Sequence, residues 1–140
     1  MIDLDALSYV CSGNVPDEFN SDFVLRNLKA IWPNYAARGA RYLVLARYVG
    51  SISEVARYKE AVPFSDLTVC RVVAPPDTVR ERLMRREVGC ERDFLATLSQ
   101  TLADRGDALA VEDFVVENGP GRSITELARE VATRAGWALR

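Results

Sequence analysis

Residues 67–78 read Leu-Thr-Val-Cys-Arg-Val-Val-Ala-Pro-Pro-Asp-Thr. The first seven are mostly apolar or β-branched, which is typical of a buried strand, and the two prolines that follow favour the start of a helix. We therefore predict a strand over Leu67–Val73, followed by a helix that runs to Gly89. A strand that leads directly into a helix is the repeating unit of parallel α/β folds.

Upstream of this stretch, the sequence predicts a helix and two further strands. Apolar residues spaced by four, three and four positions predict a helix over Ser21–Arg38, capped by Asn20 or Ser21. Pro33 lies inside that helix and should kink or split it. The apolar run Tyr42–Ala46 predicts a buried parallel strand, and Ile2–Leu7 looks like the end of another strand.

Two Ser-x-x-Glu patterns mark the starts of further helices. Ser51–Glu54 and Ser123–Glu126 are capping boxes, in which side chains satisfy the free N–H groups of the first helical turn. The second box opens the last helix, which Gly136 should end. Between the two boxes we predict a helix over Arg92–Arg105 and a short strand over Phe114–Val116.

The order of these elements predicts the fold class. Strands that alternate with helices are joined by right-handed crossovers, so the sheet is parallel and helices cover both faces. We therefore expect a three-layer α/β fold with a mostly parallel sheet, in a single domain over residues 1–140. Such sheets bind ligands at the carboxyl ends of their strands.

The composition excludes several classes of function. Histidine is absent, so Ser-His-Asp, Cys-His and histidine-ligated zinc sites are excluded. A net charge of −2 gives no signature of nucleic-acid binding, and no apolar run approaches the ~20 residues of a membrane span. Three cysteines without C-x-x-C spacing, and the lack of a signal-peptide pattern, predict a cytoplasmic protein.

Four parts of the sequence resemble one known family. They are Asp3-Leu4-Asp5, residues 67–78, the arginine-rich residues 82–89, and residues 113–123 with the helix that ends Ala135-Gly136-Trp137. Their order is similar to that of P-loop small-molecule kinases of the adenylylsulfate, gluconate, shikimate and chloramphenicol phosphotransferase type, and of their uncharacterised actinobacterial relatives. In that family, they correspond to an acidic D-x-D motif, a strand with its turn, an arginine-bearing lid, and the adenine-side loop. The resemblance implies ATP-dependent phosphoryl transfer to a small acceptor, with ATP and Mg²⁺ as cofactors.

The resemblance also implies roles for particular residues. Asp3 and Asp5 would be catalytic and contact the acceptor hydroxyl, whereas Asn118, Gly121 and Arg122 would bind the nucleotide. The alternatives are two solvated carboxylates near a chain end and an ordinary Asn-Gly-Pro-Gly turn.

Five arginines are candidates for anion contacts, because planar guanidinium groups match phosphate oxygens. The resemblance implies that Arg82, Arg85 and Arg86 clamp phosphates as a lid. Arg26 and Arg47 would bind the substrate, and Arg47 directly follows a predicted strand. The alternative for the lid arginines is a solvated helix face with an i,i+4 ion pair.

The phosphate loop of the family is missing. The pattern G-x-x-x-x-G-K-[ST] does not occur, and neither does any Gly-Lys pair. That loop normally cradles the nucleotide's phosphates and holds magnesium, and no metal ligand can be assigned. We therefore expect no catalysis by this chain alone, with the first strand and loop either upstream of Met1 or nonexistent. The alternative is a binding or interaction module that kept the acceptor and anion pocket.

The missing strand also affects which binding partners we expect. In the family it lies between the strands that correspond to Tyr42–Ala46 and Leu67–Val73, and each unpaired buried peptide group there would cost ~1–3 kcal/mol. The gap should close by direct pairing of these strands, by inward movement of Ile2–Leu7, or by a strand from another chain. We expect a strand-sharing homodimer or a strand-donating partner. The expected ligand is a small phosphorylated or anionic molecule, with neither nucleic acid nor membrane as partner.

Overall fold

The computed structural model describes residues 2–8, 20–86 and 90–137, with the side chains of residues 90–92 left out. Two units can be distinguished, Met1–Leu67 and Thr68–Arg140. The prediction of one domain over residues 1–140 stays a prediction. Among the described residues, no helix is long and apolar enough to cross a membrane.

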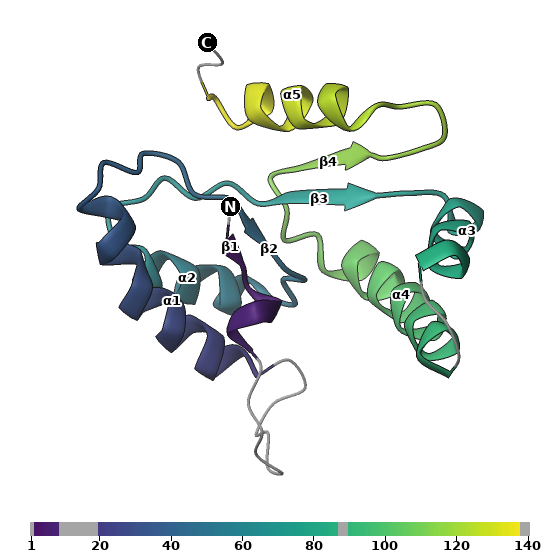
Figure 1. The fold of residues 1–140 in the computed structure, drawn as a ribbon, viewed down its shortest axis with the longest axis horizontal. Coiled ribbons are helices and arrows are strands. Elements are labelled where there is room, and N and C mark those ends of the chain that lie inside the picture. The colour runs from purple at the N-terminus through teal and green to yellow at the C-terminus, as the bar shows by residue number, and fades with distance from the viewer. Residues whose placement is uncertain (1, 9–19, 87–89, 138–140) are drawn as a thin grey trace. The chain divides into compact units, whose positions relative to one another are not determined.

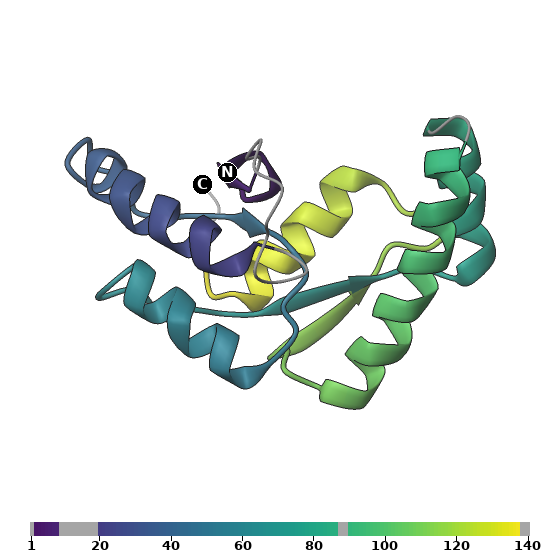
Figure 2. The ribbon, with the colours of Figure 1, turned by 90° about the horizontal axis from the view of Figure 1, so that it is seen from below.

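The first unit combines a short parallel strand pair with two packed helices. Ile2 lies opposite Leu45 in this pair. Figure 2 shows the two helices side by side, and they contact each other through a buried core that includes Val24, Leu28 and Tyr58. The elements are β1 (Ile2–Asp3), the 3₁₀ helix η1 (Asp5–Leu7), α1 (Ser21–Ala36), β2 (Leu45–Ala46) and α2 (Ile52–Ala61).

The second unit contains a longer parallel pair. Figure 1 shows α5 lying along β4, where Leu127 packs against Phe114 and Val116. The other two helices of the unit, α3 and α4, pack against each other. The elements are β3 (Cys70–Val73), α3 (Pro76–Arg86), α4 (Cys90–Leu109), β4 (Phe114–Glu117) and α5 (Ile124–Arg134).

The predicted three-layer fold, with a mostly parallel sheet and helices on both faces, is wrong. The described strands form two separate parallel pairs, β1 with β2 and β3 with β4, and neither pair joins the other. Two strands are also shorter than Tyr42–Ala46 and Leu67–Val73, since they contain only Leu45–Ala46 and Cys70–Val73. A strand with one neighbour extends only as far as that neighbour, so two-residue β1 limits β2 and four-residue β4 limits β3.

The sequence predicted the ends of helices more accurately than the pairing of strands. The Ser123–Glu126 capping box forms in full, and the Ser51 hydroxyl accepts a hydrogen bond from the Glu54 N–H. Gly136 has a φ of +73° just after α5, as a left-handed helix end requires. Pro33 does not split α1, which continues to Ala36.

Two other expected boundaries differ from the structure or lie outside it. Only Ile2–Asp3 of the expected Ile2–Leu7 strand is extended, and η1 follows it. The helix expected to run to Gly89 is described as far as Arg86, and Gly89 itself lies outside the described residues.

Candidate functional site

The first cluster of predicted site residues lies at the carboxyl ends of β1 and β2. Asp3 ends β1 opposite Ala46, and Arg47 is the first residue after β2. One carboxylate oxygen of Asp3 accepts a hydrogen bond from the Asp5 N–H at 3.0 Å. Both carboxylates are exposed. The strand pair therefore brings two acids and one arginine to the same end.

Arg47 connects this cluster to the first residue of α1. Its half-buried guanidinium donates from Nη2 to the Ser21 hydroxyl at 3.3 Å. Asn20, the N-cap, has a φ of +52° and makes no capping hydrogen bond with its side chain. That side chain instead donates to the Ser8 carbonyl at 2.9 Å. A helix N-terminus without a side-chain cap, next to a guanidinium, favours negative charge.

Tyr58 on α2 belongs to the same cluster, and sequence reasoning missed it. Its side chain is 5% exposed, and its hydroxyl has no hydrogen-bond partner among the described residues. The pKa of Tyr58 is raised to about 12, mainly by burial; the charge of Glu54 adds to the rise, and the charge of Arg47 opposes it. The only signal in the sequence was a tyrosine on the helix that follows the strand before Arg47.

Arg26 does not join this cluster. Its side chain is exposed on α1, and in the described part of the chain no hydrogen bond or ion pair involves it. The guanidinium of Arg57 on α2 pairs with Asp22 in the first turn of α1. Arg57 therefore stabilises the contact between the two helices.

A second cluster lies at the carboxyl ends of β3 and β4. Arg82 of α3 donates from Nη2 to the Asn118 side-chain oxygen at 3.2 Å, so a predicted lid residue meets a predicted nucleotide-binding residue. Asn118 is fixed in turn by its backbone N–H, which donates to the Val73 carbonyl at 2.7 Å. Arg85 forms an exposed i,i+4 ion pair with Glu81 at 2.6 Å.

Arg86 and Gly121 complete the set of predicted residues in this unit. Arg86 is exposed in the last turn of α3. Gly121 has a φ of +82°, so the loop after β4 uses a left-handed turn at which other residues would be strained.

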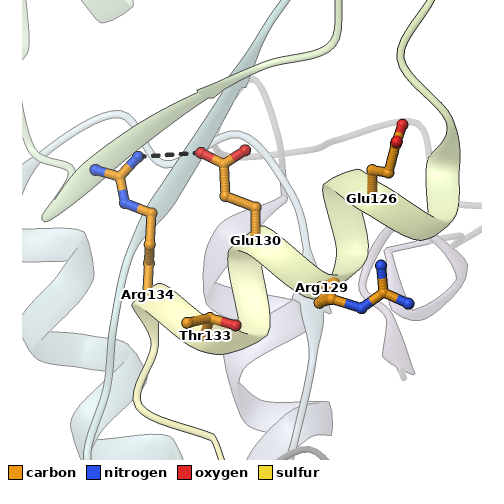
Figure 3. A pocket seen from close by; sticks show the side chains of 5 residues that line it. All are labelled: Glu126, Arg129, Glu130, Thr133 and Arg134. Atoms are coloured by element: carbon orange, nitrogen blue, oxygen red, sulfur yellow. Dashed lines mark ion pairs between the residues drawn. The ribbon is translucent and has the colours of Figure 1, made fainter.

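Arg122 binds groups of its own chain. Its guanidinium donates to the Glu117 carbonyl at 3.0 Å and to the Glu130 carboxylate at 2.6 Å. Arg134 donates to the Val115 carbonyl at 2.7 Å and pairs with the other oxygen of Glu130 at 3.5 Å, as the dashed line in Figure 3 shows. The hydrogen bond from Arg122 lowers the pKa of Glu130, and the charge of that arginine and the contact with Arg134 add to the effect.

A groove between α3 and α4 has a cavity volume of about 540 Å³. Its walls are largely apolar and include Val79, Leu83 and Ala96, while Asp77 and Arg80 add charge. None of the predicted site residues lines it.

The phosphate loop that holds Mg-ATP in P-loop kinases has no counterpart in this sequence. The glycine-rich loop and its lysine are absent from the sequence, and the described residues contain no group of three or more acidic or cysteine side chains that could hold a metal ion. Comparison with protein-family models, with curated proteins and with solved structures gave no match for this chain. The relationship to P-loop kinases therefore stays a prediction, and function is argued from the two clusters alone.

Proposed function

We propose that this chain binds a small, hydroxylated anion at the carboxyl ends of β1 and β2 and does not itself transfer phosphoryl groups. One observation carries the proposal: Arg47 donates to the hydroxyl of Ser21, the first residue of α1, so that a guanidinium lies at the N-terminus of this helix. The guanidinium and the positive end of the helix dipole together suit a phosphate or carboxylate.

The two acids beside Arg47 would bind the uncharged part of the ligand. Ionised carboxylates only accept hydrogen bonds, so Asp3 and Asp5 suit hydroxyl groups of the ligand rather than its charged end. Asp5 is exposed, whereas one oxygen of Asp3 already accepts a hydrogen bond from the Asp5 N–H. A phosphorylated or carboxylated polyol would satisfy both kinds of group. This is the kind of ligand that the acceptor site of a small-molecule kinase would hold.

The test is calorimetric titration with glycerol 3-phosphate, inorganic phosphate and glycerol. Arg47→Gln should weaken the binding of both phosphate compounds at least tenfold, because their charged group loses its contact with the guanidinium. Asp5→Asn should weaken the binding of glycerol 3-phosphate and leave the binding of inorganic phosphate unchanged. Arg38→Gln is the matched control, since Arg38 is an exposed arginine after α1, away from the strand ends.

Two results would contradict this proposal. If Arg38→Gln and Arg47→Gln weaken binding equally, the attraction is only that of overall charge. If the wild-type chain binds none of the three compounds at millimolar concentration, the site is not an anion site. Melting temperatures of each variant show whether the fold is retained.

A second candidate position for the anion is the Arg82–Asn118 contact at the ends of β3 and β4. Arg82 is exposed, and its hydrogen-bond partner is a neutral amide rather than a carboxylate. Its positive charge is thus less neutralised there than that of Arg85 or Arg122. Measuring anion binding after substitution of Arg82 and Arg86 distinguishes this position from the Arg47 cluster.

A further inference from the structure

The loop after β4 contains the only Asn-Gly pair of the sequence, Asn118-Gly119. The backbone nitrogen of the residue that follows an asparagine can attack the side-chain amide carbon and close a five-membered ring. Glycine favours this attack, because without a Cβ its nitrogen is unhindered and its backbone can adopt more conformations. The other asparagines all precede larger residues; they are Asn14, Asn20, Asn27 and Asn34.

Arg82 holds the oxygen of the Asn118 side chain. Its Nη2 donates to the Oδ1 of Asn118 at 3.2 Å. A guanidinium group only donates hydrogen bonds, so the oxygen of the amide, and not its NH₂ group, must face the arginine. When a nitrogen attacks the amide carbon, negative charge develops on this oxygen. A donor that already points at the oxygen stabilises that transition state.

The leaving group and the nucleophile of this reaction make no hydrogen bonds of their own. In the described part of the chain, no hydrogen bond involves the NH₂ group of Asn118 or the N–H of Gly119. Neither group therefore has to give up a partner before it reacts. The backbone N–H of Asn118, by contrast, donates to the Val73 carbonyl at 2.7 Å, which fixes this residue at the end of the strand pair.

A carboxylate lies beside the attacking residue. The space next to the Cα of Gly119 is limited by Glu117, whose Oε1 would lie 3.0 Å from a Cβ added there. A carboxylate this close can accept the proton that the Gly119 nitrogen loses. The base, the nucleophile, the amide and the donor to its oxygen therefore come together at the carboxyl ends of β3 and β4.

We propose that Asn118 is a site of spontaneous deamidation, promoted by Arg82 and Glu117. The Gly119 nitrogen forms a bond to the Cγ of Asn118, and its proton passes through Glu117 to Nδ2, which leaves as ammonia. Water then opens the resulting succinimide ring at either carbonyl and gives aspartate or isoaspartate. The net reaction is hydrolysis of an amide, with no oxidation or reduction and no co-reactant except water. The product places a carboxylate beside Arg82, whose original partner is neutral.

This modification is independent of the proposed anion site, and peptide mapping of the purified chain during incubation at pH 8 tests it. Trypsin releases residues 106–122 as one peptide in which Asn118 is the only amide side chain, so a mass increase there reports this residue. Deamidation should be several-fold faster in the folded chain than in urea, and the product should contain isoaspartate, which the ring intermediate gives. Asn34 is the internal control, because it is exposed and precedes the bulky Tyr35.

Two variants test the promoting groups. Arg82→Gln removes the donor to the amide oxygen and Glu117→Gln removes the base, so each should slow the folded chain about threefold or more. Arg85→Gln is the matched control, since Arg85 is exposed on the same helix and pairs with Glu81. It should leave the rate unchanged.

The comparison of the folded chain with the chain in urea uses only the wild-type protein, so it decides even if a variant fails to fold. The proposal is overturned if the folded chain deamidates at Asn118 no faster than the unfolded chain, or if the product lacks isoaspartate. It is also overturned if Arg82→Gln or Glu117→Gln reacts as fast as wild type, or if Arg85→Gln slows the reaction equally.

Discussion

Replacing Tyr58 by phenylalanine removes a buried hydroxyl and leaves the packing of the ring intact. The hydroxyl has no partner among the described residues, and a buried polar group without a hydrogen bond costs ~1–3 kcal/mol. We expect Tyr58→Phe to raise the free energy of unfolding by about 1 kcal/mol at pH 7. For a chain of this length that corresponds to an increase of roughly 3 °C in the melting temperature.

The same substitution changes the response to alkaline pH. The folded-state pKa of Tyr58 is about 12 and its ordinary value is 10.0, because burial disfavours the phenolate. Because the folded-state pKa is raised, the contribution of Tyr58 to the free energy of unfolding is fully present below pH 10. It is lost as the pH rises toward 12. Two pKa units correspond to roughly 2.7 kcal/mol. The stability advantage of Tyr58→Phe should therefore grow by up to about that amount between pH 9 and 12.

Urea unfolding followed by circular dichroism at pH 7, 9 and 11 measures both effects. Tyr35→Phe is the control, because Tyr35 is 51% exposed and the substitution should change stability by less than about 0.5 kcal/mol. A loss of more than about 1 kcal/mol for Tyr58→Phe at pH 7 would refute the reasoning. It would show that the hydroxyl has a partner, such as a buried water.

Titration with Mg-ATP should give no binding heat, because the sequence lacks the loop and lysine that hold the triphosphate; a submillimolar Kd would contradict this. Replacing Arg82 and Arg86 by alanine should weaken binding of inorganic phosphate several-fold with little change in melting temperature, since both side chains are exposed; a large drop in melting temperature would show a structural role. The backbone hydrogen bond from Ser123 lowers the pKa of Glu126, so its charge stabilises the fold above pH 4.5 and less as the pH falls. Glu126→Gln should therefore destabilise at pH 7 and become neutral near pH 3 in urea unfolding, and an equal loss at both pH values would point to packing instead.

The parts of the fold that depend on local chemistry could be predicted from the sequence. The serines at 51 and 123 cap their helices through residues three positions away, so the start of each helix is encoded within one turn. Strand lengths depend on the partner strand. The apolar run Tyr42–Ala46 could not reveal that only two of its residues would find one.

The same distinction applies to the candidate site. Arg47 could be placed in advance, because it directly follows a predicted strand, whereas Asp3 and Asp5 are singled out only through the family resemblance. The role of Tyr58 depends on packing between two helices, which no short pattern encodes. The partner of Arg122 could not be read from the loop either, since the carboxylate that holds it lies eight residues further along, on α5.

The arginine caps on β4 determine how far association through the sheet can proceed. Growth of a sheet into a ribbon or fibril needs two open edges in every copy, and the two arginines, Arg122 and Arg134, close one of these edges. Glu130 is the point on which this limit depends, because one carboxylate holds both guanidinium groups. Its lowered pKa keeps it charged into moderately acidic solution, so the terminating edge persists where many carboxylates are already protonated. Neutralising that single side chain would remove the ion pairs that hold both arginine caps on the β4 edge.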